Sequence, residues 1–274
     1  MSRGQRAWGP PARRRAPRRL SGGVGVCLAM LSMTVTAACT GGTVVSRTGS
    51  TLSTGTESER EAAALLELAM GSLSRTASVR LDIRFAGQGH HIRNTTYSAA
   101  DRGWQDIRVD DLHAWVRVVG RRTFARGDRA TLTGYFSLSD STAKRLKNRW
   151  YVLLSGDPGF GEVTSGVKLP SLISKVRTLL PVEPLHAVKP TVRNGVRVTG
   201  VRGSVPDSPG GSESAATLWI SADGRSLPVE LDLDDFASKV HIAVDFDHWG
   251  DPVRVVAPTG AVRLATLPPL TVDS

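Results

Sequence analysis

Two stretches of alternating side chains decide the fold: Ser-Val-Arg-Leu-Asp-Ile-Arg-Phe at residues 78–85 and Lys-Val-His-Ile-Ala-Val-Asp-Phe at residues 239–246. In both, every second side chain is apolar, which is typical of an antiparallel strand with one buried face and one wet face. Residues 113–118 and 227–234 repeat the pattern. Weaker strand candidates lie at residues 90–98, 104–109, 121–126, 149–154, 185–190, 195–202, 215–221, 252–257 and 261–264. A sheet of so many short strands is expected to curl.

Three segments have helical spacing instead. Apolar residues repeat at three- and four-residue intervals over 58–73, where Ser58 and Glu61 predict a capping box. A second helix is predicted near 139–148, and a third between Pro170 and Pro181. We therefore predict an α+β fold: a large curled antiparallel sheet, or half-barrel, with a few helices packed on its concave face. Residues 58–274 are expected to form this single domain.

The N-terminus predicts export. Residues 1–19 are basic, residues 22–38 form a short apolar stretch, and Val-Thr-Ala-Ala-Cys closes it at residues 35–39. This ending resembles a bacterial lipobox, with Thr36 where leucine is usual. We predict a signal peptide at 1–38, a diacylglycerol and palmitate-type acyl chains on Cys39, and a flexible tether over 39–57. Release by an ordinary signal peptidase is the alternative, and Sec and twin-arginine export both stay open.

The charge follows the same division. The chain has a formal charge of +10, but seven arginines and no acids lie within residues 1–39, which leaves 28 basic against 25 acidic residues beyond them. A balanced surface gives no electrostatic reason to expect nucleic-acid binding. The two cysteines, Cys27 and Cys39, both lie in the leader region, so the predicted domain has no disulfide or thiolate chemistry.

The order of these features resembles the actinobacterial lipoproteins of the LppX/LprG type and, more distantly, the LolA-like carriers. The resemblance is carried by the lipobox and tether, the Ala/Leu-rich helix at 59–73, the strand at 78–85, Arg-Trp-Tyr-Val at 149–152, and Trp-Gly-Asp-Pro-Val at 249–253. It covers about residues 58–265. It implies a half-barrel sheet around helices with an apolar cavity for acyl chains, and a lipid or lipoprotein carrier at the cell envelope. We expect a lipid or glycolipid as the ligand of such a cavity. It does not imply which ligand is bound.

The candidate ligand-binding residues are therefore apolar. Those predicted to share the inner face, and to line either a closed core or an acyl cavity, are Val79, Leu81, Ile83, Phe85, Val240, Ile242, Val244 and Phe246. His241, Asp245 and Asp247 share the wet face of one strand, but a solvated face explains them better than a metal site. Asp232, Asp234 and Asp235 form an acidic cluster at a strand end, which a turn explains as well as glycosidase chemistry does. We predict no cofactor, metal or catalytic residue.

Two functions remain from this reasoning. The first is a lipoprotein on the extracytoplasmic face of the cell membrane that binds or transfers lipid in an apolar cavity, without catalysis. The alternative is a non-catalytic envelope scaffold or interaction domain with a closed core. A hydrolase with an unrecognised site is a distant third.

Overall fold

The computed structural model describes residues 56–157, 159–205, 214–235 and 239–264. All of them belong to one compact unit within residues 40–274. Cys39, the predicted signal peptide and most of the predicted tether lie outside the described residues. Within those residues, no helix is both long and apolar enough to cross a bilayer.

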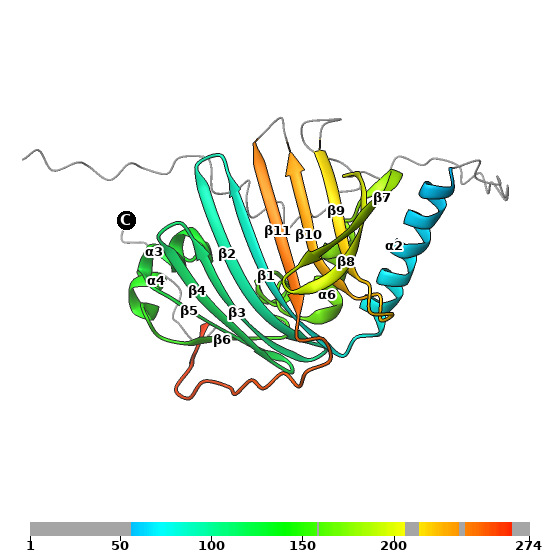
Figure 1. Ribbon diagram of the computed structural model, residues 1–274. Coiled ribbons are helices and arrows are strands. Elements are labelled where there is room, and N and C mark those ends of the chain that lie inside the picture. Colours follow the sequence, from blue (N-terminus) through cyan, green and yellow to red (C-terminus); the bar gives the residue numbers. More distant parts are fainter. Residues whose placement is uncertain (1–55, 158, 206–213, 236–238, 265–274) are drawn as a thin grey trace, which may run out of the picture. The chain divides into compact units, whose positions relative to one another are not determined.

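The described strands form one continuous sheet of twelve strands, in the order β12-β6-β5-β4-β3-β2-β1-β11-β10-β9-β8-β7 (Figure 1). The sheet is open, with β12 and β7 at its two edges. The strands are β1 (Ser78–Gly87), β2 (His90–Ala99), β3 (Arg102–Val109), β4 (Leu112–Val119), β5 (Arg122–Gly127), β6 (Tyr151–Leu154), β7 (Val182–Arg193), β8 (Val196–Ser204), β9 (Ser214–Ser221), β10 (Pro228–Asp235), β11 (Val240–Asp247) and β12 (Val262–Arg263).

The sheet is mixed, so the expectation of a wholly antiparallel sheet is wrong at one edge. Every other neighbouring pair is antiparallel, but β12 runs parallel to β6. The reason is topological: β11 already has β1 and β10 as neighbours, so the chain after β11 has to travel to a free edge of the sheet.

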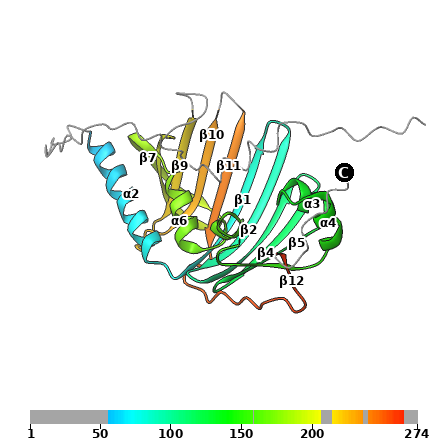
Figure 2. The ribbon, with the colours of Figure 1, turned by 180° about the vertical axis from the view of Figure 1, so that it is seen from behind.

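Residues 248–261, which we call the strap, connect β11 to β12. The strap is fixed near β1, where Gly250 N donates to Ser78 O at 3.0 Å, and near β6, where Val262 N donates to Trp150 O at 2.9 Å. Between them, the guanidinium of Arg117 on β4 donates to Val256 O at 3.2 Å. The strand predicted at 252–257 is therefore wrong, because this segment runs past the ends of the strands instead of pairing with one (Figure 2).

Five helices are described: α2 (Glu57–Arg75), α3 (Arg129–Gly134), α4 (Asp140–Leu146), α5 (Phe160–Ser165) and α6 (Leu169–Arg177). The three predicted helices correspond to α2, α4 and α6, while α3 and α5 were not predicted because each is only six residues long. The capping box of α2 uses Thr56 and Glu59 instead of Ser58 and Glu61. The same Ser/Thr-x-x-Glu spacing occurs twice, two residues apart, and the structure uses the earlier copy.

Strand register divides the sheet into two faces. One, which we call the apolar face, carries Leu81 opposite Phe246 and Ile83 opposite Val244. The other, the charged face, carries the alternate residues of the same strands, such as Arg84 and Asp245. Helices α2 and α6 pack on the apolar face of strands β1 and β8–β11, and α3 and α4 pack with strands β3–β6 in a second apolar cluster.

Candidate ligand-binding face

All eight residues predicted to line a core or cavity lie on the apolar face of the two neighbouring strands β1 and β11. Six of them belong to the apolar cluster that α2 and α6 join, whereas Phe85 and Val240 lie on the same face outside that cluster. Figure 2 shows α2 and α6 beside this part of the sheet. They differ in how completely they are covered. Those that are fully buried are Val79, Leu81, Val240, Val244 and Phe246. Those that are only half-buried are Ile83, Phe85 and Ile242.

The fully buried part is closed by helices. Ala62, Ala69 and Leu73 of α2 and Leu172 and Val176 of α6 pack on this cluster, each no more than 5% exposed. Dense packing of this kind leaves little room for a ligand. This part of the face is a core, and it fixes where the helices lie.

The half-buried part forms a continuous row across six adjacent strands. We call it the apolar row: Leu233, Ile242, Phe85, Ile92, Val109 and Leu112, each directly opposite the next. Leu233 is buried, and the other five are half-buried. At about 4.8 Å per interstrand step, the row extends roughly 24 Å along the sheet. Its members lie toward the β1–β2 hairpin, at the end of the face that α2 and α6 leave less covered.

Polar side chains interrupt the apolar face in the centre of the sheet, beside the row. The Ser98 hydroxyl donates to Val167 O at 2.6 Å, and the Gln105 amide donates to Gly166 O at 3.2 Å. Gly103 lies beneath Val167, where a Cβ would approach the Val167 side chain to 2.8 Å. We call these contacts the linker clamp, because they hold the α5–α6 linker on β2 and β3.

The clamp continues into a fully satisfied network. Gln105 also donates to the Thr96 hydroxyl at 3.0 Å, and Thr96 donates in turn to Asn94 Oδ1 at 3.1 Å. Thr123 and Thr164 share a hydrogen bond of 2.7 Å, which fixes α5 to β5. Buried polar groups of this kind are costly unless they are paired, so the network fixes one position for the linker.

A lysine joins the two helices that flank this linker. Lys175 Nζ of α6 donates to the hydroxyl of Ser165, the last residue of α5, at 3.1 Å. Burial lowers the pKa of Lys175, because the partly desolvated ammonium is less stable than in water. The linker is thus held from the sheet side and from the helix side.

On the charged face, arginines and aspartates alternate between neighbouring strands. Asp82 is the most enclosed carboxylate of the group: Arg80 approaches it at 3.4 Å, Arg93 at 3.3 Å, and the Thr95 hydroxyl donates to it at 3.2 Å. The side-chain hydrogen bond to Asp82 is the largest cause that raises the pKa of Arg93. This face is held by paired charges, consistent with the solvated face expected from the sequence.

The three residues considered for a cation do not converge. His241 contacts Asp234 at 2.8 Å, Asp245 pairs with Arg84 at 2.9 Å, and Asp247 pairs with Arg80 at 3.2 Å. Within the described part of the chain, no group of three potential metal ligands is present.

The aspartates at the end of β10 are likewise occupied separately. Asp232 accepts from Trp219 Nε1 at 3.0 Å, whereas Asp234 contacts His241. Asp235 is an odd number of residues from both of them along the strand, so it lies on the other face of the sheet, and it is buried. Asp232 and Asp234 thus have different partners, and the geometry does not form a facing carboxylate pair.

The most perturbed carboxylate of the charged face is Glu230. Its side chain is buried, Arg193 lies 3.5 Å from it, and Arg193 also stacks on Trp219 with 4.6 Å between the guanidinium and the ring centroid. Burial raises the pKa of Glu230 to about 7; the neighbouring Asp232 carboxylate adds to this, and Arg193 opposes it. Arg193 ends β7, so these contacts hold the β7–β8 hairpin on the charged face.

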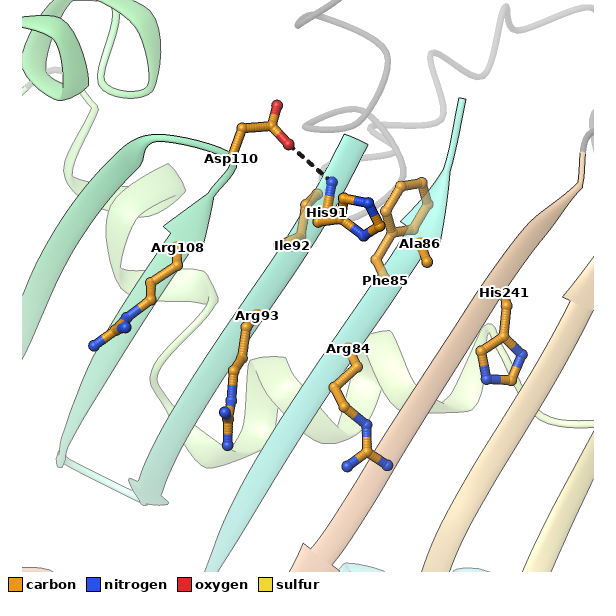
Figure 3. Close-up of a pocket in the computed structure, with 9 residues that line it drawn as sticks. All are labelled: Arg84, Phe85, Ala86, His91, Ile92, Arg93, Arg108, Asp110 and His241. Atoms are coloured by element: carbon orange, nitrogen blue, oxygen red, sulfur yellow. Dashed lines mark hydrogen bonds between the residues drawn. The ribbon is translucent and has the colours of Figure 1, made fainter. Parts of the chain in front are cut away.

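Near the β1–β2 hairpin lies a hollow with a volume of about 320 Å³ (Figure 3). We call it the arginine hollow. Its lining residues are Arg84, Phe85, Ala86, His91, Ile92, Arg93, Arg108, Asp110 and His241. Sequence reasoning did not single out the arginines among them. The hairpin turn at Gln88 and Gly89, both with positive φ, could have revealed them, because a two-residue turn of this kind fixes which residues face each other.

Comparison with known proteins gives a match to solved structures only. No family model matches the chain, and no curated protein matches it. The structure is similar to the lipoprotein LppX of Mycobacterium tuberculosis, with 19% identity over 73% of this chain and 100% of that one and a TM-score of 0.44. It is also similar to LprF of Mycobacterium bovis, with 14% identity over 73% and 98% of the two chains and a TM-score of 0.46.

One of these structures is of LppX, a lipoprotein of the group that the sequence resembles. Identities this low carry neither a ligand nor an activity from those proteins to this chain.

Proposed function

We propose that this protein is a lipoprotein anchored through Cys39 to the extracytoplasmic face of the cell membrane, and that it binds or transfers acyl chains without catalysing a reaction. The binding surface is the apolar row, together with the helix surfaces that face it. In this proposal the apolar face is the concave side of a curled sheet, and the helices pack within it.

The observation that carries the proposal is a difference in solvent exposure between apolar side chains on one face of the sheet. Leu81 and Phe246 are sealed beneath helices, whereas Phe85, Ile92 and Ile242, on the same face, keep part of their surface exposed. A partly exposed apolar surface of this kind is typical of a binding site. Its length of roughly 24 Å suits a long extended acyl chain. Burying a C16 chain would contribute about 10 kcal/mol before the entropy of binding is subtracted.

The experiment places a charge in the row, at two half-buried positions that border the core clusters, and circular dichroism first checks that each variant is folded. The variants Ile242→Asp and Val109→Asp are compared with Val192→Asp, in which an exposed valine outside the row is changed in the same way. The full-length protein in nanodiscs is titrated with a fluorescent fatty acid. We expect both row variants to weaken binding at least about tenfold, because a carboxylate in an apolar site is strongly disfavoured, and the control to bind like the unchanged protein. Equal affinity in all four proteins would show that the apolar row is not the binding site.

The anchor is tested separately. Cys39→Ala should leave the precursor uncleaved and without acyl chains, which intact-mass measurement of the membrane fraction detects. A mature, membrane-retained product from this variant would contradict the lipidation.

One observation favours the second candidate, a scaffold with a closed core. Val79, Leu81, Val240, Val244 and Phe246 are each no more than 4% exposed, so five of the eight predicted cavity residues are already covered by protein. If the unchanged protein takes up no acyl probe, the row becomes a surface for a protein partner, and the scaffold is the better account.

A further inference from the structure

The arginine hollow contains three arginines that strand register places side by side. Arg84 on β1 lies directly opposite Arg93 on β2, and Arg93 lies directly opposite Arg108 on β3. Like charges at directly opposite positions destabilise a sheet. The sequence nevertheless repeats the charge on three adjacent strands, at one end of the sheet.

Each arginine has a carboxylate partner that leaves much of its guanidinium available. Arg84 contacts Asp245 through Nη1 at 2.9 Å, Arg93 contacts Asp82 through Nη2, and Arg108 contacts Asp106 through Nε at 3.6 Å. A guanidinium has five N–H donors. The side chains are 53%, 65% and 63% exposed, respectively, so the remaining donors face the hollow and the solvent.

The other lining residues add polar groups and little negative charge. His91 and His241 contribute imidazoles, and Ala86 leaves space between them (Figure 3). Asp110 is the one carboxylate in the lining. Its two oxygens are already engaged, one by His91 N at 2.8 Å and the other by His90 Nδ1 at 2.7 Å. The hydrogen bond from His90 is the largest cause that lowers the pKa of Asp110.

We propose that the arginine hollow binds a phosphate group, with Arg84, Arg93 and Arg108 as its donors. Strand register places the three arginines in one row across neighbouring strands, and arginine contacts phosphate oxygens in bidentate fashion. The volume of the hollow is at the lower end of the range for small-molecule sites, which fits a headgroup-sized ligand. The phosphate is either a free soluble one or the headgroup of an anionic phospholipid. The three arginines lie on the charged face, opposite the apolar row, although Phe85 and Ile92 of the row also line the hollow. The phosphate proposal does not depend on the acyl site.

The test compares two double-charge changes in the full-length protein, kept in zwitterionic detergent micelles. The variant Arg84→Gln/Arg108→Gln removes two donors and retains Arg93, which contacts the enclosed Asp82. The control Arg202→Gln/Arg197→Gln removes the same charge from exposed positions on β8, outside the hollow. A third variant, Ala86→Asp, keeps every arginine and adds a carboxylate to the lining. If this variant also loses binding, the loss cannot be due to a missing contact between an arginine and the sheet.

The probes distinguish the two sources of phosphate. Calorimetric titration with inorganic phosphate, up to about 10 mM, detects a soluble ligand. Hydrogen exchange of residues 84–93, in micelles with and without phosphatidylglycerol, detects a lipid headgroup. We expect one of these probes to bind the unchanged protein and the control variant with equal affinity. In both hollow variants the affinity should fall at least about tenfold, because charge-assisted hydrogen bonds are lost.

Either probe giving that pattern supports the site and identifies its source. Binding that is absent from the unchanged protein with both probes, or that survives in the hollow variants, overturns the proposal. Because the acyl titration uses residues outside the hollow, failure here leaves that result unaffected.

Discussion

Glu230 gives a prediction about stability that can be worked from the structure. The fold raises the pKa of this carboxyl from 4.5 to about 7, chiefly because it is buried, so the folded protein holds the proton more tightly than the unfolded chain does. The resulting stabilisation is complete below the ordinary pKa of glutamate and is lost as the pH rises through about 7. At 1.36 kcal/mol per pKa unit, the rise from 4.5 to about 7 corresponds to a loss of about 3 kcal/mol.

The variant Glu230→Gln removes the titration and keeps the shape of the side chain. At pH 8 the variant should be more stable than the unchanged protein by about 1–2 kcal/mol. This gain is smaller than the whole loss caused by ionising Glu230, because Arg193 loses one of its two carboxylate contacts in the variant. At pH 5 the two proteins should be nearly equal, since Glu230 is then mostly protonated.

The assay is urea unfolding followed by circular dichroism at several pH values between 5 and 8. The informative quantity is the difference in free energy of unfolding between the two proteins, because all other groups are common to both. The exposed Glu61 of α2 supplies the control, Glu61→Gln. If the free energies of unfolding of the Glu230→Gln variant and the unchanged protein stay parallel from pH 5 to 8, the account of this carboxyl is wrong.

Two further substitution pairs test the packing. Gly103→Ala should destabilise the protein by about 1–3 kcal/mol in thermal unfolding, because its Cβ would approach Tyr97 O to 2.6 Å and the Val167 side chain to 2.8 Å. Gly161→Ala, with open space around it, should not. A loss from Gly161→Ala as large as that from Gly103→Ala would contradict the linker clamp. Leu81→Ala should cost about 2–5 kcal/mol in urea unfolding, since Leu81 is 1% exposed. Leu68→Ala, at a side chain 56% exposed, should change stability by less than about 0.5 kcal/mol, and equal losses would refute the assigned core.

Much of the sheet could be predicted because alternation is a local signal. The stretches 78–85 and 239–246 were recognised as strands with one apolar face, and the structure pairs them directly, with Leu81 opposite Phe246. The same pattern placed all eight cavity candidates on one face. Alternation cannot show which part of a face the helices cover, so the difference between sealed Leu81 and half-buried Phe85 required the structure.

The features that were missed depend on contacts distant in sequence. The polar side chains of β2 and β3, such as Ser98 and Gln105, weaken the apolar alternation because they bind the α5–α6 linker, about 60 to 70 residues away. The parallel edge strand β12 follows from where the strap ends, which no local pattern encodes. Helix α3 begins with Asp128 as its N-cap, a signal present in the sequence but followed by too short a segment for helical spacing to be recognised.

The central claim is that the apolar row holds an acyl chain, and the most direct measurement is native mass spectrometry of the full-length protein, followed by organic extraction and identification of what is released. The account predicts a lipid bound in about one-to-one ratio beyond the acyl groups on Cys39, and its loss in Ile242→Asp. A protein that carries no lipid and takes up none when phospholipid or glycolipid is added would contradict it.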